Sequence, residues 1–366
     1  MEVDAEVPLV NLCEMVDEPA DDSGLTGWRS LIVLLAVALS VVVVADVTLR
    51  RLSPPKYVRE VADAMKDYEH EDPTVLVIGS SHARTFHVMD GIVRDRTDGR
   101  ERILAVPLEW GKFRSYEWLL HNRIEPFIDE PGPNGKKRAS LKRFILLTAW
   151  WDACWVDGDP PVFNLPSRAW AFDHFEDAVL EKGIDDYSRN YVTSRWGDLW
   201  HGSILVSDRG QGHLISALRE RVRPLSPEAK AKQFEFKLES WKGIMHHGKQ
   251  CGLHPEELAA AERLLAWGQD RGYDVTLMLY PMMPITVDDE DRELVQKPFQ
   301  EAMRALAAKR NVRFIDATFV HNVKNEDFLD FDHLSPEAHA RFSKWLLEGE
   351  MSFLVEGERV AGGMLP

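Results

Sequence analysis

The sequence is poor in cysteine and has no excess of positive charge. Its 366 residues include only three cysteines, with no C-x-x-C pair among them: Cys13, Cys154 and Cys251. Such usage excludes a disulfide-rich framework and a cysteine zinc site, and it allows one bridge at most. The 44 basic residues are outnumbered by 60 acidic ones, a net charge of −16. This balance disfavours binding to phosphate backbones, so we expect no nucleic-acid partner.

Repeats, low-complexity segments and metal-ligand motifs are also lacking. A group of histidines and one cysteine near position 250 follows no zinc-ligand spacing: His246, His247, Cys251 and His254. We therefore predict neither a metal nor a cofactor. With 45% hydrophobic residues, the chain can bury a sizeable core.

The first 50 residues are unlike the rest of the chain. Residues 1–26 contain eight acidic residues and no basic one, which predicts a disordered acidic tail over residues 1–27. Ser30 to Ala45 then form an uncharged apolar run. If the flanking Arg29 and Arg50 snorkel, residues 28–50 can cross a bilayer as a single membrane anchor.

Two other interpretations of the apolar run stay open. A cleaved signal peptide normally starts with a basic segment, whereas this run follows an acidic tail. A buried helix is possible because the uncharged run is only 16 residues long, short of the ~20 that a span prefers. The basic residues that follow the run would keep the body in the cytoplasm by the positive-inside rule.

From residue 75 onward, short apolar runs alternate with helix-like stretches. Five runs are typical of buried parallel strands: residues 75–79, 102–107, 144–149, 274–280 and 312–316. Amphipathic stretches lie between them, among them Glu256 to Gly272 and Asp291 to Arg310. This βαβ pattern predicts an α/β fold, a three-layer α/β/α sandwich on a five-stranded parallel sheet.

The third and fourth predicted strands are about 120 residues apart, far more than one crossover helix needs. Residues 152–250 are therefore expected to form an insertion or cap within a body that covers residues 56–350, with a tail at 351–366. Nine of the 12 tryptophans lie between residues 110 and 241. They suit a helical cap that either packs its own small core or stacks on sugar rings.

A serine pair follows the first predicted strand. Gly79, Ser80 and Ser81 stand at its carboxyl end, where open α/β sheets place their ligands. The tripeptide by itself is equally typical of a helix cap or a phosphate-binding turn. His82 and His87 come soon after it and would either line a pocket or lie on the surface.

A second polar group stands near the C-terminus. Asp330 and His333 follow the last predicted strand and precede a helix that opens at Ser335 and Pro336. A histidine can take a serine proton, and a carboxylate can hold the tautomer of that histidine. Asp332 competes with Asp330, but we expect a residue adjacent to the histidine to turn back toward its ring less easily.

These two segments resemble the SGNH/GDSL hydrolase superfamily. Its first block is a strand followed by a Gly-x-Ser turn, matched by Gly79 to Ser81, and its last block is Asp-x-x-His, matched by Asp330 to His333. The resemblance covers about residues 73–350 without the insertion. It implies a flavodoxin-like α/β fold with Ser81 as nucleophile, His333 as base and Asp330 as the carboxylate.

The resemblance also implies an oxyanion hole. In that family the hole combines the N–H of the nucleophile, a glycine after the second strand and an asparagine after the third. Ser81 and Gly111 match the first two donors. The third strand instead runs into Trp150 and Trp151 with no asparagine. Trp151, with its indole N–H, is the candidate for the third donor, and the hydroxyl of Thr148 stays open as an alternative.

The function implied is a serine esterase or O-acyltransferase that works through an acyl-serine. The N-terminal run and both motifs resemble membrane-anchored proteins of teichoic acid and envelope polysaccharide acylation. That likeness implies an acylated small molecule or glycan as substrate, a membrane-bound acyltransferase as partner and an extracytoplasmic body. Two alternatives stay open: a non-catalytic protein that binds glycan or a membrane partner, and a phosphate-binding α/β protein.

Overall fold

The computed structural model describes residues 24–52, 56–68, 72–108, 111–131, 140–154, 252–320, 322–329 and 332–355, with a few positions between 226 and 242. The chain divides into two units, Met1–Ser53 and Pro54–Pro366. Of the predicted disordered acidic tail (1–27), residues 1–23 lie outside the described residues, whereas residues 24–27 are helical. Most of the predicted insertion (152–250) and most of the predicted C-terminal tail (351–366) also lie outside the described residues.

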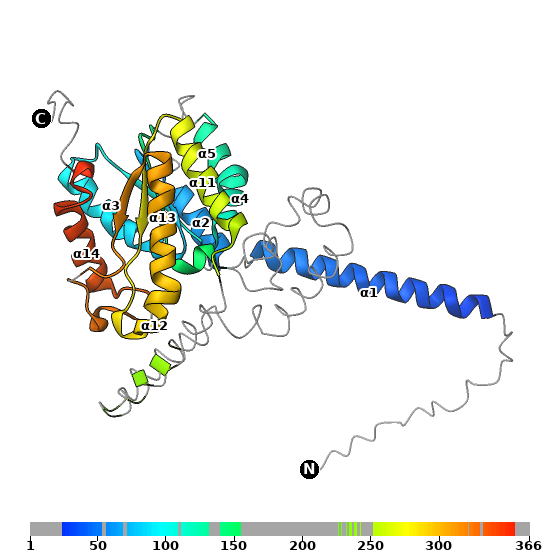
Figure 1. Cartoon of the computed structure of the whole chain (residues 1–366). Coiled ribbons are helices and arrows are strands. Elements are labelled where there is room, and N and C mark those ends of the chain that lie inside the picture. Colours follow the sequence, from blue (N-terminus) through cyan, green and yellow to red (C-terminus); the bar gives the residue numbers. More distant parts are fainter. Residues whose placement is uncertain are drawn as a thin grey trace, which may run out of the picture. The chain divides into compact units, whose positions relative to one another are not determined.

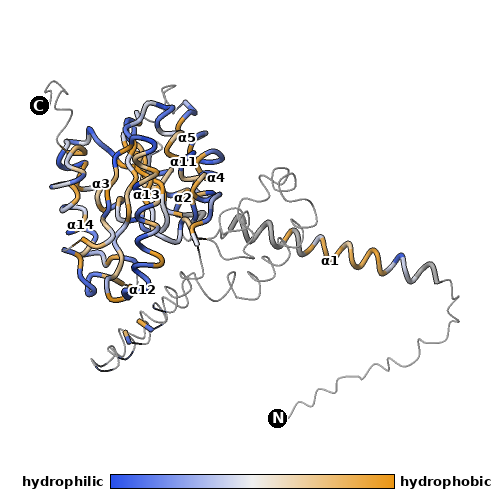
Figure 2. The backbone as a smooth tube through the Cα atoms, viewed as in Figure 1, coloured by the Kyte–Doolittle hydropathy of each residue, from blue (hydrophilic) through white to orange (hydrophobic). Residues whose placement is uncertain are grey.

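The first unit contains one long helix, α1 (Gly24–Leu52). Its apolar side chains face solvent: Leu34 is 66% exposed and Leu39 is 65% exposed. Figure 2 shows this hydrophobic stretch along the helix. Within the described part of the chain, no helix has both the length and the apolar character of a bilayer span. The membrane anchor at 28–50 stays a prediction.

The second unit is built on a five-stranded parallel sheet with the order β2-β1-β3-β4-β5. Its strands are β1 (Val75–Gly79), β2 (Ile103–Pro107), β3 (Arg143–Thr148), β4 (Asp274–Leu279) and β5 (Arg313–Asp316). Each of the five predicted runs overlaps one strand, β3 starting one residue earlier than predicted, so the predicted α/β class is confirmed. In this order the connections reverse direction between β1 and β3, the point at which such sheets bind ligands.

Helices cover both faces of the sheet (Figure 1). One face carries α3 (Thr85–Arg96) and α14 (Pro336–Glu348). The other carries α2 (Lys56–Asp67), α4 (Phe113–Leu119), α5 (Glu125–Asp129), α11 (Pro255–Asp270) and α13 (Lys297–Arg310), the last of these preceded by the short α12 (Asp289–Asp291). Side chains alternate across the sheet. Val75 and Val77 pack into the core beneath α3 and α14, whereas Leu76 and Ile78 pack into the core on the opposite face.

Two π-helical turns interrupt the helices on that second face. They span Leu120–Ile124 and Arg292–Gln296. Each is followed two residues later by a proline, Pro126 or Pro298. Proline lacks an N–H and its ring clashes with the carbonyl four residues earlier, so a wider turn relieves the conflict. The predicted helix at 291–310 is therefore helical throughout but changes its hydrogen-bond pattern.

The two ends of the predicted insertion lie side by side. Cys154 and Leu253 form an isolated antiparallel bridge, and the N–H of His254 donates to the carbonyl of Ala153 at 2.9 Å. Cys154 is also disulfide-bonded; the other two cysteines of the chain lie outside the described residues. The sequence allowed one bridge, and the structure contains a bonded cysteine at the base of the insertion.

Candidate active site

The serine pair lies on a turn that the sheet forces to be tight. A side chain at Gly79 would place its Cβ 2.7 Å from the carbonyl oxygen of Leu147 on β3, so only glycine fits where β1 ends. Ser80 follows in an extended conformation. Ser81 begins a single 3-10 turn, η1 (Ser81–Arg84), which continues into α3.

The histidine segment is a closed loop between β5 and α14. Phe328 pairs with Leu334 in an antiparallel bridge, and the N–H of Leu329 donates to the carbonyl of His333 at 2.7 Å. Ser335 then caps α14, because its hydroxyl accepts the N–H of Ala338 at 3.3 Å. This loop presents Asp332 and His333 at the carboxyl edge of the sheet.

The structure brings Ser81 and His333 into direct contact. Oγ of Ser81 lies 2.6 Å from Nε2 of His333, a hydrogen-bond distance for a serine and its general base. Ser81 is buried, while the side chain of His333 is 30% exposed. The pair is therefore packed in place and still reachable from solvent.

Among the described residues, Asp332 places a carboxylate next to His333. Its Oδ1 lies 2.9 Å from Nδ1 of His333, an ion-pair contact whose alignment falls short of a hydrogen bond. Asp330 lies outside the described residues. An adjacent residue is expected to turn back toward the ring less easily, yet Asp332 reaches it, because the chain bends at Asp332 instead of continuing as a strand. The predicted role of Asp330 stays a prediction. Adjacency limits the alignment of the contact but not its distance.

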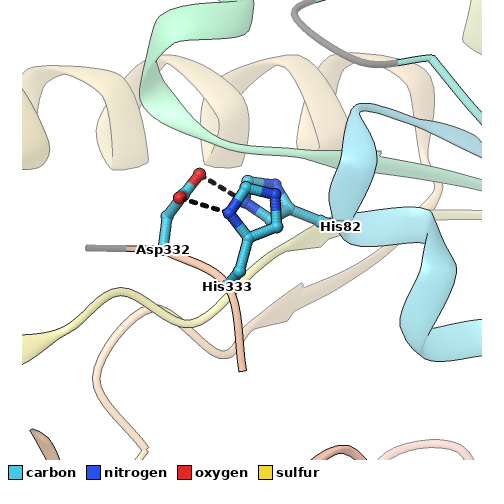
Figure 3. Close-up of side chains that lie close together, drawn as sticks. All are labelled: His82, Asp332 and His333. Carbon is cyan, nitrogen blue, oxygen red and sulfur yellow. Dashed lines mark hydrogen bonds and ion pairs between the residues drawn. The ribbon is translucent and has the colours of Figure 1, made fainter. Parts of the chain in front are cut away.

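Sequence reasoning missed a second histidine bound to the same carboxylate. Nε2 of His82 lies 2.6 Å from Oδ2 of Asp332, and Nδ1 of His82 lies 2.7 Å from Oγ of Ser80. Figure 3 shows both imidazoles converging on Asp332. The two Ser-His pairs therefore share one carboxylate. The available signal was the Ser-Ser-His run itself, which places a histidine directly beside the candidate nucleophile.

Aromatic rings hold His82 in place. Its imidazole stacks on Tyr280, with ring centroids 4.2 Å apart, and also contacts Trp151 at 5.6 Å. Tyr280 is fixed in turn by a hydrogen bond of 2.8 Å between its hydroxyl and Thr85, whose hydroxyl lies 2.6 Å from Nδ1 of His339. The side chain of His82 is fully buried, so a substrate reaches His333 more easily than His82.

The histidines keep the shared carboxylate ionised. Burial by itself would raise the pKa of Asp332, but the charges of His82 and His333 and the hydrogen bond from His82 hold that pKa below its ordinary value. The same surroundings act on His339, where burial, and then the two histidines, lower the pKa to about 4. His339 is therefore neutral near pH 7.

The N–H groups of the predicted oxyanion donors Ser81 and Gly111 differ in their hydrogen-bond acceptors. Ser81 stands at the first position of a helical turn, where N–H groups have no acceptor inside the helix. The N–H of Gly111, by contrast, donates to the carbonyl of Leu108 at 2.9 Å. That bond argues against Gly111 as the second donor. Its lack of a side chain has a packing reason, because a Cβ would collide with Cε1 of Tyr116.

Trp151, the predicted third donor, lies beside the site. It belongs to the 3-10 turn η3 (Trp150–Ala153) at the carboxyl end of β3, and its ring contacts His82. The neighbouring Trp150 and Trp151 rings meet edge to face at 5.3 Å. Assignment of the Trp151 indole N–H to an oxyanion stays a prediction.

A buried acid lies under this turn. Asp152 is fully buried, and its Oδ2 accepts the N–H of Ala149 at 3.0 Å. Burial raises its pKa to about 8, although hydrogen bonds from Ala149, Thr148 and Tyr116 oppose the shift. Asp152 is therefore mainly protonated at pH 7.

His82, Asp332 and His333 could also be considered as metal ligands, since their ligand atoms lie within 4.8 Å of one another. The contacts argue for proton sharing. Nitrogen and oxygen are 2.6 and 2.9 Å apart, whereas the ligands of a tetrahedral zinc site stand about 3.3 Å from each other. Nε2 of His333 is moreover engaged by Ser81.

Comparisons with known proteins give similarity in structure only. No protein-family model matches the chain, and the curated protein sequences give no match. Solved structures that resemble it include a catalytic mutant of Axe2, an acetylxylan esterase from Geobacillus stearothermophilus, at 10% identity and a TM-score of 0.39 over 80% of this chain and 97% of that one. A GDSL-like lipase from Bacteroides thetaiotaomicron matches at 7% identity and 0.35, over 81% and 98%. The assignment of a reaction therefore rests on side-chain geometry.

Proposed function

We propose that this chain is a serine-dependent ester hydrolase or O-acyltransferase of the SGNH type that works through an acyl-serine. The observation that carries the proposal is the contact of 2.6 Å between Oγ of Ser81 and Nε2 of His333, with Asp332 at the other ring nitrogen. A serine, an imidazole and a carboxylate in this arrangement make a nucleophile, a base and an orienting group.

His333 acts in both halves of the proposed reaction, as a base when an oxygen attacks and as an acid when an alcohol leaves. Nε2 of His333 takes the Ser81 proton as Oγ bonds to the ester carbonyl carbon, and Asp332 stabilises the imidazolium that forms. When the tetrahedral intermediate collapses, the bond to the leaving alcohol breaks and His333 gives that alcohol its proton. The acyl group is then an ester of Ser81. Attack by water or a sugar hydroxyl, with His333 as base, releases it and restores the Ser81 proton.

Stabilisation of the oxyanion is the least complete part of this site. We propose the Ser81 N–H at the start of η1 as one donor and the Trp151 indole N–H as another; the first position of a helical turn supports Ser81, and the contact of the Trp151 ring with His82 supports Trp151. This arrangement favours a second candidate function, a non-catalytic protein that binds an acylated glycan at the same edge, because the Gly111 N–H already has an acceptor.

The acceptor and the location belong to the proposal as well. We propose an acylated envelope glycan as substrate, with the body outside the cytoplasm, α1 as the membrane attachment and a membrane-bound acyltransferase as a partner. The disulfide at Cys154 supports an oxidising compartment, since such bonds rarely persist in the cytosol. The apolar residues exposed along α1 support the attachment.

Hydrolysis of p-nitrophenyl acetate by the full chain tests the catalytic proposal. We expect Ser81→Ala to abolish turnover while the neighbouring Ser80→Ala variant retains measurable activity, because only Ser81 contacts the accessible histidine. A wild-type chain that is folded yet inert toward this ester and toward acetylated xylan would favour the binding function instead.

A further inference from the structure

The network around Asp332 contains more than a nucleophile, a base and a carboxylate. Its members follow one another without a break, each within 2.9 Å of the next: Ser81, His333, Asp332, His82 and Ser80. Two adjacent serines thus begin and end a chain of contacts that closes through the shared carboxylate. A Ser-His-Asp mechanism uses only the first three residues, which leaves His82 and Ser80 to be explained.

The tautomers of this network follow from its acceptors. An ionised Asp332 only accepts, so each imidazole must present an N–H to it. His82 then carries its proton on Nε2, and its Nδ1 can only accept the hydroxyl proton of Ser80. His333 likewise carries its proton on Nδ1, which leaves Nε2 free to accept from Ser81. Ser80 therefore fixes the tautomer of His82, and His82 donates to the carboxylate that His333 needs.

The two contacts on Asp332 differ in quality. The bond from His82 measures 2.6 Å and is aligned, whereas the contact with His333 measures 2.9 Å and is not. Asp332 comes from a loop, while His82 lies on η1 and is clamped between rings. The more rigid partner therefore sets the position of the carboxylate.

We propose that His82 is a positioning residue, which holds Asp332 against His333 and is itself oriented by Ser80. The inference rests on the proposed function and adds to it a second histidine that never touches substrate. Loss of a hydrogen bond to a buried charge lowers activity on the order of 10-fold to 100-fold when the charge must stay in place.

Paired substitutions at His82 separate positioning from packing. His82→Gln places an amide N–H near the former Nε2 and so keeps a donor to Asp332. His82→Asn places its amide N–H near the former Nδ1 and so leaves Asp332 without this donor. We expect the kcat of His82→Gln to stay within about tenfold of wild type. We expect His82→Asn and His82→Leu to lose about 10-fold to 100-fold in kcat with little change in KM. The exposed His87 on α3 provides the control, since His87→Asn should leave kcat unchanged.

The pH dependence of kcat/KM distinguishes positioning from packing, because it would not change if His82 only filled space. Without the His82 donor, Asp332 is no longer held against His333 and stabilises the imidazolium less, so the acid limb of kcat/KM should move to lower pH in His82→Asn and not in His82→Gln. The titratable groups that face His82 are Asp332 and His333 from the loop, Tyr280 after β4 and His339 from α14. Ser80→Ala should cause a smaller shift in the same direction.

The outcomes are distinct. Suppose that wild type is active and Ser81→Ala is inactive. If folded His82→Asn and His82→Gln variants then have the kcat and the pH profile of wild type, the positioning role is wrong and the proposed function stands. Equal losses in the Gln and Asn variants would equally overturn it, because they would indicate packing alone. An inert wild type would instead overturn the proposed function.

Discussion

Asp332 and His333 are neighbours in the chain, and yet their side chains meet, with Oδ1 of the carboxylate 2.9 Å from Nδ1 of the imidazole. The bend at Asp332 and the closed loop around it make this possible. Because the same carboxylate also accepts from His82, one buried charge holds two imidazoles in defined tautomers.

Replacement of that carboxylate should be far more harmful than replacement of the nearby Asp330. Asp332→Asn can donate where Asp332 accepts, so His333 would lose the tautomer that leaves Nε2 free for Ser81. We expect kcat to fall about 10³-fold to 10⁴-fold, with a much smaller change in Asp330→Asn. Steady-state hydrolysis of an activated ester measures both. A larger loss in Asp330→Asn would return the role to Asp330.

Gly79 should tolerate no side chain. In Gly79→Ala the new Cβ would lie 2.7 Å from a backbone oxygen of β3, and backbone cannot move aside without disturbing the sheet. We expect a loss of about 1–3 kcal/mol in the free energy of unfolding, measured by urea denaturation, together with reduced activity. Gly91 on α3 is the control, since nothing lies within 4 Å of its added Cβ and Gly91→Ala should be neutral or stabilising by up to about 1 kcal/mol.

Asp152 should make the protein less stable as the pH rises. Its folded pKa of about 8 lies above the ordinary value of 3.8, so the folded state binds more protons between these values. The contribution of Asp152 to stability is then fully present below pH 3.8 and is lost as the pH rises through 8. We expect Asp152→Asn to remove this decline, so that its Tm advantage over wild type grows from pH 5 to pH 9.

A matched variant distinguishes this effect from a general loss of charge. Asp95 on α3 is 78% exposed, and Asp95→Asn should give a Tm difference that does not grow with pH. If Asp152→Asn shows the same flat difference as Asp95→Asn, Asp152 is ionised in the folded protein and the account of its burial fails.

The architecture was largely predictable because buried parallel strands leave a strong sequence signal. The run from Val75 to Gly79 is uniformly apolar and buried on both faces, and a short continuous apolar run is typical of such a strand. The start of α14 was equally readable, since Ser335 and Pro336 are typical capping residues. The π-helical turns were not predicted, although the prolines that cause them are visible in the sequence.

Contacts between loops were harder to predict. Ser81 and His333 are 252 positions apart, and the parallel sheet brings them together because both follow the carboxyl ends of strands. The choice between Asp330 and Asp332 depends on the backbone path of one short loop, which no periodicity records. The roles of His82 and Gly111 depend on which hydrogen-bond partners their atoms find after folding. Sequence therefore predicted which segments meet, but not which atoms.

The central claim is that Ser81 is a nucleophile activated by His333. It is tested most directly by reacting the full chain with a fluorophosphonate probe and locating the adduct by mass spectrometry. The account predicts a single adduct on the peptide that contains Ser80 and Ser81, retained in Ser80→Ala and abolished in Ser81→Ala and His333→Ala. An adduct that persists in folded Ser81→Ala, or no adduct on folded wild-type protein, would contradict it.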